Sequence, residues 1–306
     1  MKKRRIAFKN EDIECNFTYL YEGDLSLVID IIRHYERIVF RGFAATRHGK
    51  RDFSNLFPFP KGENPFSGES GGNRITMDIE GNAIEGNFRD EPPISLSLSF
   101  TIEDYYFSST IPRWIDKVPV LNKLYQSIHL TSVVSLLHED FPLVTFDGDV
   151  RVGTENYHLD RARGAIAHHW GWYFPNYVFL MCNGFEDPGT LLTLSFADSI
   201  TSAGIGIKSG YLYLHHHGKE KKLISPFQGK VISFWEGGKL CVVARFDEGN
   251  FVRVNIDPDK GIAFPNVFNT TCMTVMNVGC EIEGMGESDK AVLDVKGLDV
   301  IELMKR

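Results

Sequence analysis

Apolar residues recur in short alternating runs along most of the 306-residue chain. The runs are rich in Val, Ile, Phe and Tyr, and Gly, Asn and Asp separate them at intervals typical of β-hairpins. The clearest example is a meander of three strands over residues 230–235, 240–246 and 251–256. Its first turn contains Gly237 and Gly238, which suit a tight hairpin connection. Repeated meanders of this kind favour all-β barrels or sandwiches over parallel α/β sheets.

Other segments are less regular. Residues 24–37 fit either a helix, with apolar residues at a 3.6-residue period behind an Asp24 N-cap, or a strand, and residues 118–128 are a second helical candidate. Residues 57–73 are rich in Gly, Pro and Asn and read as a long loop, in which the prolines exclude a central strand. Residues 291–303 indicate a terminal strand with a bend at a glycine.

The composition and net charge of the chain argue against some classes of function. A content of 43% apolar residues is enough to bury a sizeable core. The net charge of −7 argues against a general phosphate-binding surface, so nucleic acid is not expected as a partner. No uninterrupted apolar run reaches the length of a membrane span, although the chain could contact a membrane transiently and handle lipids.

Five widely spaced cysteines without a Cys-x-x-Cys pair indicate packed, reduced thiols rather than a zinc or redox site. The basic N-terminal residues are followed by charges that interrupt any apolar signal region. Together these features predict a cytoplasmic protein.

The segment 148–185 is the most unusual part of the chain. It contains Gly148-Asp-Val-Arg-Val-Gly, then Tyr157-His-Leu-Asp, then Ala167-His-His-Trp-Gly-Trp-Tyr-Phe-Pro, and a run ending in Cys182-Asn-Gly-Phe. This order of a short hairpin, a Trp-Gly pair, a Phe-Pro pair and a strand ending in Cys-Asn-x-Phe resembles the tocopherol cyclase-like family, which is related to carotenoid hydratase-like proteins. The resemblance is best over residues 133–256.

The resemblance implies two lipocalin-like antiparallel β-barrel domains packed together, with few short helices. A predicted turn at residues 146–150 places the domain boundary so that the domains cover residues 1–147 and 148–306. The resemblance also implies a site for a prenylated lipid, and no cofactor is expected. This chain departs from the family where His169 replaces an acidic or amide residue and where Phe179 replaces Trp.

A cyclase or hydratase of this type protonates an alkene, so it needs a proton donor, a dry apolar cavity and aromatic faces that stabilise a carbocation. His169 and Asp160 are the candidate catalytic residues, with Glu186 as another carboxylic acid, and a carboxylic donor would need a pKa raised by burial. The candidate ligand-binding residues are His138, His168, Trp170, Trp172, Tyr173 and Asn183. An alternative is that the aromatic residues form core and that the histidines cap a turn.

The run His215-His216-His217 raises the question of a metal, since imidazole is a common ligand. On a strand, successive side chains point to opposite faces, so only His215 and His217 are expected to share one. With no acidic or cysteine partner at chelate spacing, a metal site is not expected.

Three hypotheses remain open from the sequence. The protein is an enzyme that cyclises or hydrates a prenylated or isoprenoid lipid, a carrier or sensor of a small hydrophobic ligand, or an interaction protein whose interdomain cleft is filled by side chains. The sequence leaves the oligomeric state and the identity of the ligand open.

Overall fold

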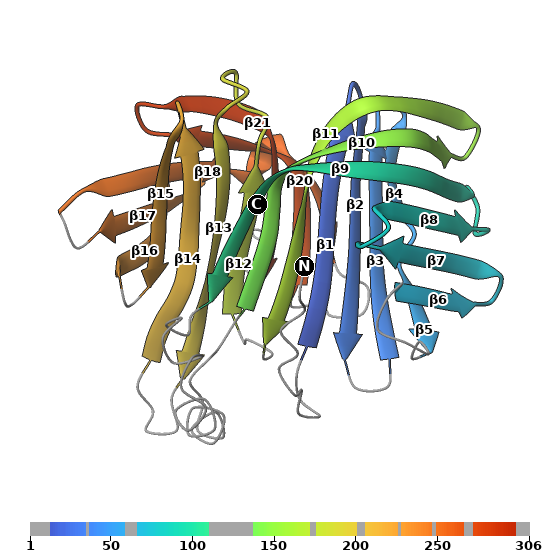
Figure 1. Ribbon diagram of the computed structural model, residues 1–306, viewed down its shortest axis with the longest axis horizontal. Coiled ribbons are helices and arrows are strands. Elements are labelled where there is room, and N and C mark those ends of the chain that lie inside the picture. The colour runs from blue at the N-terminus through green and yellow to red at the C-terminus, as the bar shows by residue number, and fades with distance from the viewer. Residues whose placement is uncertain are drawn as a thin grey trace.

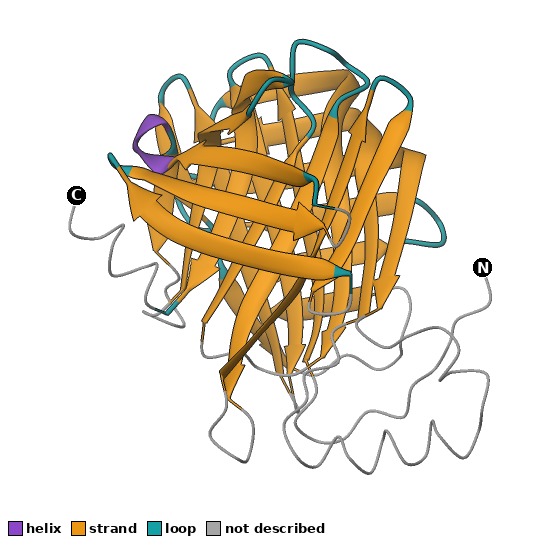
Figure 2. Cartoon of the chain, turned by 90° about the vertical axis from the view of Figure 1, so that its left-hand side faces the viewer, coloured by secondary structure: helices purple, strands orange, loops and turns teal. Residues whose placement is uncertain are grey.

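A computed structural model describes residues 13–34, 37–58, 66–109, 137–171, 176–200, 206–225, 228–246, 249–265 and 272–297. Nearly all of them lie in antiparallel strands that form two large curled sheets (Figures 1 and 2). The all-β fold with two packed barrels is therefore confirmed. Within the described residues, the only helix is the single 3-10 turn Pro258–Lys260, and none is long and apolar enough to cross a membrane.

The first sheet has eleven strands in the order β4-β3-β2-β1-β11-β10-β9-β8-β7-β6, and β5 also pairs with β3. Their bounds are β1 Ile13–Glu22, β2 Leu25–His34, β3 Arg37–Thr46, β4 Gly49–Asp52, β5 Asn55–Pro58, β6 Phe66–Ser70, β7 Asn73–Asp78, β8 Ala83–Phe88, β9 Ile94–Ser109, β10 Leu137–Val152 and β11 Glu155–Gly171.

The second sheet has ten strands in the order β15-β14-β13-β12-β21-β20-β18-β17-β16, and β19 pairs with β20. Their bounds are β12 Asn176–Cys182, β13 Leu191–Ile200, β14 Gly206–His216, β15 Lys219–Ser225, β16 Gly229–Glu236, β17 Lys239–Phe246, β18 Phe251–Asp257, β19 Ile262–Pro265, β20 Cys272–Ile282 and β21 Gly286–Lys296.

Several sequence predictions can be compared with these strands. The meander appears as β16, β17 and β18, with Gly237 and Gly238 both at positive φ in the first turn, so it is confirmed. For residues 24–37 the strand reading is confirmed over Leu25–His34 and the helix reading is wrong there, because every residue of β2 pairs with β1 or β3. Residues 118–128 lie outside the described residues.

The predicted loop at 57–73 is partly wrong, since it includes β6. The exclusion of a central strand there holds, because β5 pairs only with β3 and β6 ends its sheet. The predicted turn at 146–150 lies inside β10 at a register shift, and the chain passes from the first sheet to the second only after Gly171. The terminal strand begins earlier than predicted, at Gly286, and its described part ends at Lys296.

Each sheet curls around an apolar core of its own, and a third core lies between the two sheets. Strand alternation makes this possible, because one face of a strand points into its barrel and the other faces the neighbouring barrel. In β1, for example, Leu20 belongs to the core of the first barrel, whereas Phe17 and Tyr19 belong to the core between the sheets. Aromatic pairs such as Phe17 with Phe179 and Phe43 with Phe264 join the sheets directly.

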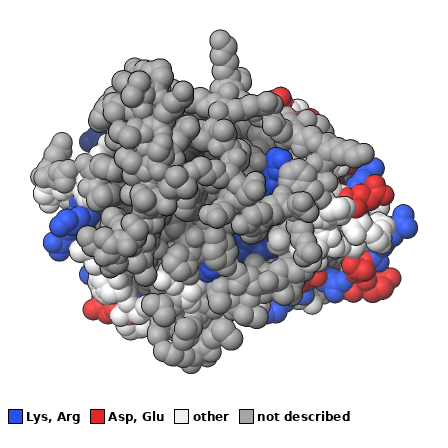
Figure 3. Space-filling model, turned by 90° about the horizontal axis from the view of Figure 1, so that it is seen from below, with Lys and Arg blue, Asp and Glu red and all other residues white. Residues whose placement is uncertain are grey.

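Side-chain hydrogen bonds also join the sheets. Asn277 lies at a register shift of β20 with φ of 57°, and its Oδ1 accepts hydrogen bonds from Ser26 Oγ at 2.8 Å and Tyr19 Oη at 3.1 Å. Tyr213 Oη of β14 donates to Asp104 of β9 at 3.0 Å. The surface seen from below carries acidic and basic side chains interspersed along its described edge (Figure 3).

Candidate functional site

Three polar side chains meet between the sheets, and we call them the histidine cluster: His169 of β11, Asp140 of β10 and Tyr211 of β14. His169 Nε2 lies 3.0 Å from Asp140 Oδ1, and Tyr211 Oη donates a hydrogen bond to Asp140 Oδ2. The side chains of Asp140 and Tyr211 are buried, whereas His169 is 14% exposed. The cluster therefore links a buried carboxylate to an imidazole that solvent reaches.

Strand register explains how the cluster assembles. His169 pairs with Cys15 of β1, and its side chain faces the second barrel, where its ring meets Phe179 edge-on at 4.9 Å between centroids. His168 pairs with Asn16 and points into the first barrel, where it is buried. Because successive side chains of a strand alternate, the adjacent histidines serve different environments.

The polar surroundings of His168 are unusual for a barrel core. Asn16 and Thr18 point to the same interior face of β1, next to apolar Ile29 and Ile31 of β2. Asn16 Oδ1 and Thr18 Oγ1 are buried and have no hydrogen-bond partner within the described part of the chain. Buried polar atoms normally have partners, so this interior face is a place where a ligand could donate hydrogen bonds.

Asp160 does not join the histidine cluster. It lies toward the opposite end of β11 from His169, and its side chain is exposed. The burial that a carboxylic proton donor requires is absent there. Glu186, the other acidic candidate, is also exposed, in the connection after β12.

Other predicted site residues fall partly outside the described residues. The backbone of His138 pairs directly with His169, and Trp170 belongs to β11, but their side chains are not among those described. Trp172 and Tyr173 lie outside the described residues. The register thus brings His138 and Trp170 to the end of the sheet that carries the histidine cluster.

Asn183 takes a position between the sheets. Its Nδ2 donates to the carbonyl oxygens of Pro142 at 3.0 Å and Gly164 at 2.6 Å, and its Oδ1 accepts from Tyr21 Oη at 3.1 Å. The amide is buried, and both of its donor hydrogens are used. These bonds fasten the connection after β12 to the first sheet. Partial burial raises the pKa of Tyr21 to about 12, so its hydroxyl is a donor at neutral pH.

A second polar group between the sheets, the arginine network, consists of Asp30, Arg41, Asp294, Tyr177 and Thr274. Arg41 of β3 forms an ion pair with Asp30 of β2 and a bidentate pair with Asp294 of β21, with N–O distances of 3.0 and 3.2 Å. Tyr177 and Thr274 donate to Asp294 at 2.6 and 2.5 Å. Arg41 is 2% exposed, and Asp30, Asp294 and Thr274 are also buried, whereas Tyr177 is partly buried.

Burial disfavours the charged forms of Arg41 and Asp30, whereas pairing with an opposite charge favours them. Burial opposes the charge of Arg41, but Asp294 and Asp30 together raise its pKa well above the ordinary value, and the guanidinium stays charged. Burial raises the pKa of Asp30, since Arg41 compensates it only in part and the charge of Asp294 adds to the rise. Cys15 donates to Asp30 Oδ1 at 2.9 Å, and burial raises the pKa of this thiol well above its usual range.

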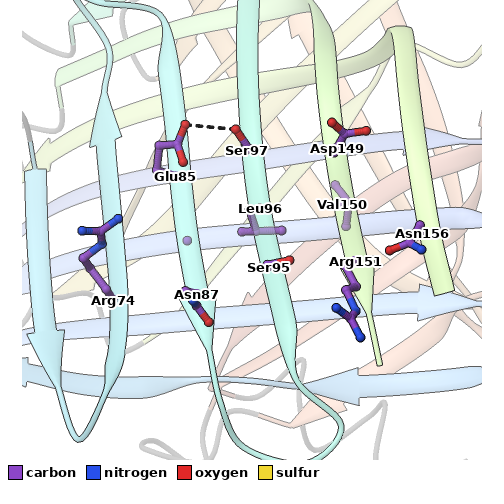
Figure 4. A pocket seen from close by; sticks show the side chains of 11 residues that line it. Arg74, Glu85, Asn87, Ser95, Leu96, Ser97, Asp149, Val150, Arg151 and Asn156 are labelled. Atoms are coloured by element: carbon purple, nitrogen blue, oxygen red, sulfur yellow. Dashed lines mark hydrogen bonds between the residues drawn. The ribbon is translucent and has the colours of Figure 1, made fainter. Parts of the chain in front are cut away.

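A polar groove of about 420 Å³ lies on the outer face of the first sheet, across β7 to β11 (Figure 4). Figure 4 shows Arg74, Glu85, Asp149 and Arg151 beside it, with Glu85 accepting a hydrogen bond from Ser97 at 3.1 Å. None of the predicted site residues lines this groove. Its open, mixed-charge lining differs from the apolar surroundings of the histidine cluster.

Comparison of the fold with solved structures finds likenesses along almost the whole chain. The crystal structure of a protein from Nitrosomonas europaea, provisionally designated AttH, matches with a TM-score of 0.60 at 11% identity and covers 95% of this chain and 94% of that one. Kievitone hydratase from Nectria haematococca matches with a TM-score of 0.55 at 7% identity, covering 94% and 89%. No protein-family model and no curated protein matches the sequence. At these identities the likeness establishes a shared two-barrel fold.

Sequence reasoning missed Asp140, Tyr211 and the arginine network. A usable signal existed for two members of the network, because Asp30 interrupts the apolar run Leu-Val-Ile-Asp-Ile-Ile and Arg41 interrupts Ile-Val-Phe-Arg-Gly-Phe. A charged residue inside an apolar strand is expected to have a buried partner. Tyr211, which contacts Asp140, and Asp294, which contacts Arg41, lie on the other sheet, so spacing in the sequence does not identify them.

Proposed function

We propose that the protein protonates a carbon–carbon double bond of an isoprenoid ligand at the histidine cluster, and so acts as a cyclase or hydratase. One observation carries the proposal: buried Asp140 accepts hydrogen bonds from Tyr211 and His169, and His169 also reaches solvent. A carboxylate paired in this way stabilises an imidazolium and fixes the orientation of its ring. The imidazolium is the proposed proton donor.

The proposed reaction needs no cofactor, because the proton added to the alkene is recovered when the C–O bond forms. A proton passes to one alkene carbon and leaves a tertiary carbocation on the other. A phenol oxygen of the ligand or a water molecule forms the new C–O bond and releases a proton, which returns to His169 directly or through solvent. Phe179 beside His169 supplies an apolar wall, and the proposal assigns Trp170, Trp172 and Tyr173 to the aromatic surface that stabilises the cation.

Two similarities support this choice of chemistry. The segment around His169 resembles the tocopherol cyclase-like family, whose reaction is the cyclisation described above. The chain also shares its fold with a protein named kievitone hydratase. Both reactions begin with the same protonation step, so one site would serve either outcome. The free thiols of all five cysteines would suit a reducing compartment such as the cytoplasm.

A second candidate function is non-catalytic binding of a hydrophobic ligand with a polar head. Asn16 Oδ1 and Thr18 Oγ1 inside the first barrel favour it, because neither has a partner among the described residues and each would accept a hydrogen bond from a ligand hydroxyl. In this case the ligand would occupy the barrel, and the histidine cluster would only help to hold the sheets together.

Incubation of the protein with prenylated hydroquinones, followed by mass spectrometry of the recovered ligand, separates the two functions. We expect an isomer of the ligand or its hydrate as the product. His169→Gln should reduce turnover by about a hundredfold or more, the size typical of lost acid–base catalysis, whereas Asp160→Asn should leave it unchanged. Intact ligand recovered from a saturable complex would contradict the enzyme and favour the carrier.

A further inference from the structure

Three side chains that could bind a metal ion converge at the end of β14 in the second barrel, and none of them belongs to the histidine cluster. Asp187 lies in the connection between β12 and β13, His216 is the last residue of β14, and His217 begins the turn into β15. Their ligand atoms, one from each residue, all lie within 4.8 Å of one another. His216 is half-buried and His217 is 72% exposed.

The turn explains why two adjacent histidines face one point. Side chains alternate only while the backbone remains extended, but His217 has φ of 49° and Gly218 has φ of 71°, which form a tight hairpin turn. The imidazole of His217 therefore returns toward that of His216, and the ring centroids are 4.0 Å apart. The sequence predicted that His215 and His217 share a face, because it did not predict the left-handed conformation of His217. His215 lies one position earlier on the extended part of β14.

The acidic partner comes from a distant part of the sequence. Asp187 Oδ2 lies 3.7 Å from His216 Nδ1 and 3.4 Å from His217 Nδ1. Ligand atoms about 2.0–2.1 Å from a tetrahedral zinc ion are separated by about 3.3–3.4 Å, so both distances are close to those of a coordinated set. Because His217 is exposed, its imidazole can rotate to bring its ligand nitrogen closer to that of His216.

Thr190 contacts two of the three side chains. Its Oγ1 donates to Asp187 Oδ2 at 2.8 Å and lies 2.7 Å from His216 Nδ1. Metal-binding carboxylates and imidazoles commonly have such neighbouring partners, which fix the orientation of the ligands.

We propose that Asp187, His216 and His217 form a binding site for a divalent transition-metal ion of the zinc class. Two imidazoles and one carboxylate are a ligand set that such ions accept, and water would complete the coordination. The bound ion would clamp the connection between β12 and β13 to the hairpin of β14 and β15. The site is separate from the proposed catalytic chemistry, so the two proposals stand or fall independently.

Titration of the full chain with Zn²⁺ by calorimetry, and with Co²⁺ by visible absorption, tests the site. We expect one saturable ion per chain and a metal-dependent rise in melting temperature. Either His217→Ala or Asp187→Asn should weaken binding by at least about tenfold. Because His217 is exposed, His217→Ala should leave the melting temperature of the metal-free protein almost unchanged.

His158→Ala provides the matched control, because His158 is an exposed histidine that pairs with Asp149 at 2.9 Å. This variant should bind Zn²⁺ like the wild type. The proposal is overturned if the wild type shows no saturable binding, or if His217→Ala and Asp187→Asn bind as tightly as the wild type. It is also overturned if His158→Ala weakens binding as much as they do.

Discussion

The arginine network and the histidine cluster lie between the same two sheets, and they differ in how completely their polar groups are enclosed. Arg41 contacts two carboxylates, one from each sheet, and Asp294 also accepts hydrogen bonds from Tyr177 and Thr274. His169, in contrast, contacts a carboxylate, that of Asp140, and its side chain is 14% exposed. The first arrangement is suited to holding the sheets together, and the second to exchanging a proton with a ligand or solvent.

The difference shows that polar groups that stabilise the fold can be fully buried, whereas a reactive group must remain accessible to its substrate or to solvent. A fully enclosed ion pair resists change, because removing one partner leaves an uncompensated charge in an apolar interior. A proton donor must instead reach its substrate and be reprotonated. Substitutions in the two groups should therefore divide into those that affect stability and those that affect activity.

The largest expected loss of stability comes from Arg41→Met. It would leave Asp30 and Asp294 buried without a cation, so we expect the free energy of unfolding to fall by about 3–5 kcal/mol in urea denaturation. Arg47→Met is the matched control, because Arg47 pairs with Asp24 at the surface at 3.5 Å, and its loss should cost at most about 1 kcal/mol. Equal effects of the two substitutions would show that the network does not hold the sheets together.

A smaller loss is expected when Asn183, which fastens the second sheet to the first, is replaced by Ala. The carbonyl groups of Pro142 and Gly164 would lose their donor inside the protein, which should reduce the free energy of unfolding by about 1–3 kcal/mol. Asn156→Ala, at an exposed position of β11, should have almost no effect in the same measurement. If Asn183→Ala abolished ligand binding without lowering stability, the residue would be a ligand contact instead.

The smallest effect is a pH dependence that comes from Asp30. Its pKa is raised in the folded protein, mainly by burial, so the folded state binds a proton at Asp30 more readily than the unfolded chain does. This contribution to stability is present below the unfolded pKa of about 3.9 and is lost as pH rises through the folded pKa. The stability of the wild type relative to Asp30→Asn should therefore fall as pH rises from about 4. Unfolding curves at several pH values that show a constant difference, or a rising one, would contradict this.

The sequence predicted the strands better than the contacts between the sheets. Alternating apolar residues identify β16 to β18, where Val252, Val254 and Ile256 are buried as expected, although Phe251 points outward. Alternation also determines that His168 and His169 face opposite sides once β11 is known to be a strand. It cannot determine which residues of the other sheet lie opposite, because packing between the sheets is set by their curvature and relative position.

The same limit explains why the sequence predicted only part of the candidate site. His169 and Asp160 were both named from the sequence as candidate proton donors, and no acidic partner was predicted for His169. The partner that the fold provides is Asp140, which pairs with Ala167 on the neighbouring strand and so presents its carboxylate on the face shared with His169. Tyr211 comes from the other sheet, which no local pattern indicates.

Turnover of a prenylated hydroquinone in deuterated water by the wild type and by Asp140→Asn tests the central claim most directly. Protonation of an alkene forms a new C–H bond, so the wild type should give a product with one carbon-bound deuterium. Asp140→Asn should be slower by about a hundredfold or more, because the imidazolium at His169 would lose its carboxylate. A product without carbon-bound deuterium, no product from the wild type, or an undiminished rate in Asp140→Asn would contradict the assignment of the histidine cluster as the proton-transfer site.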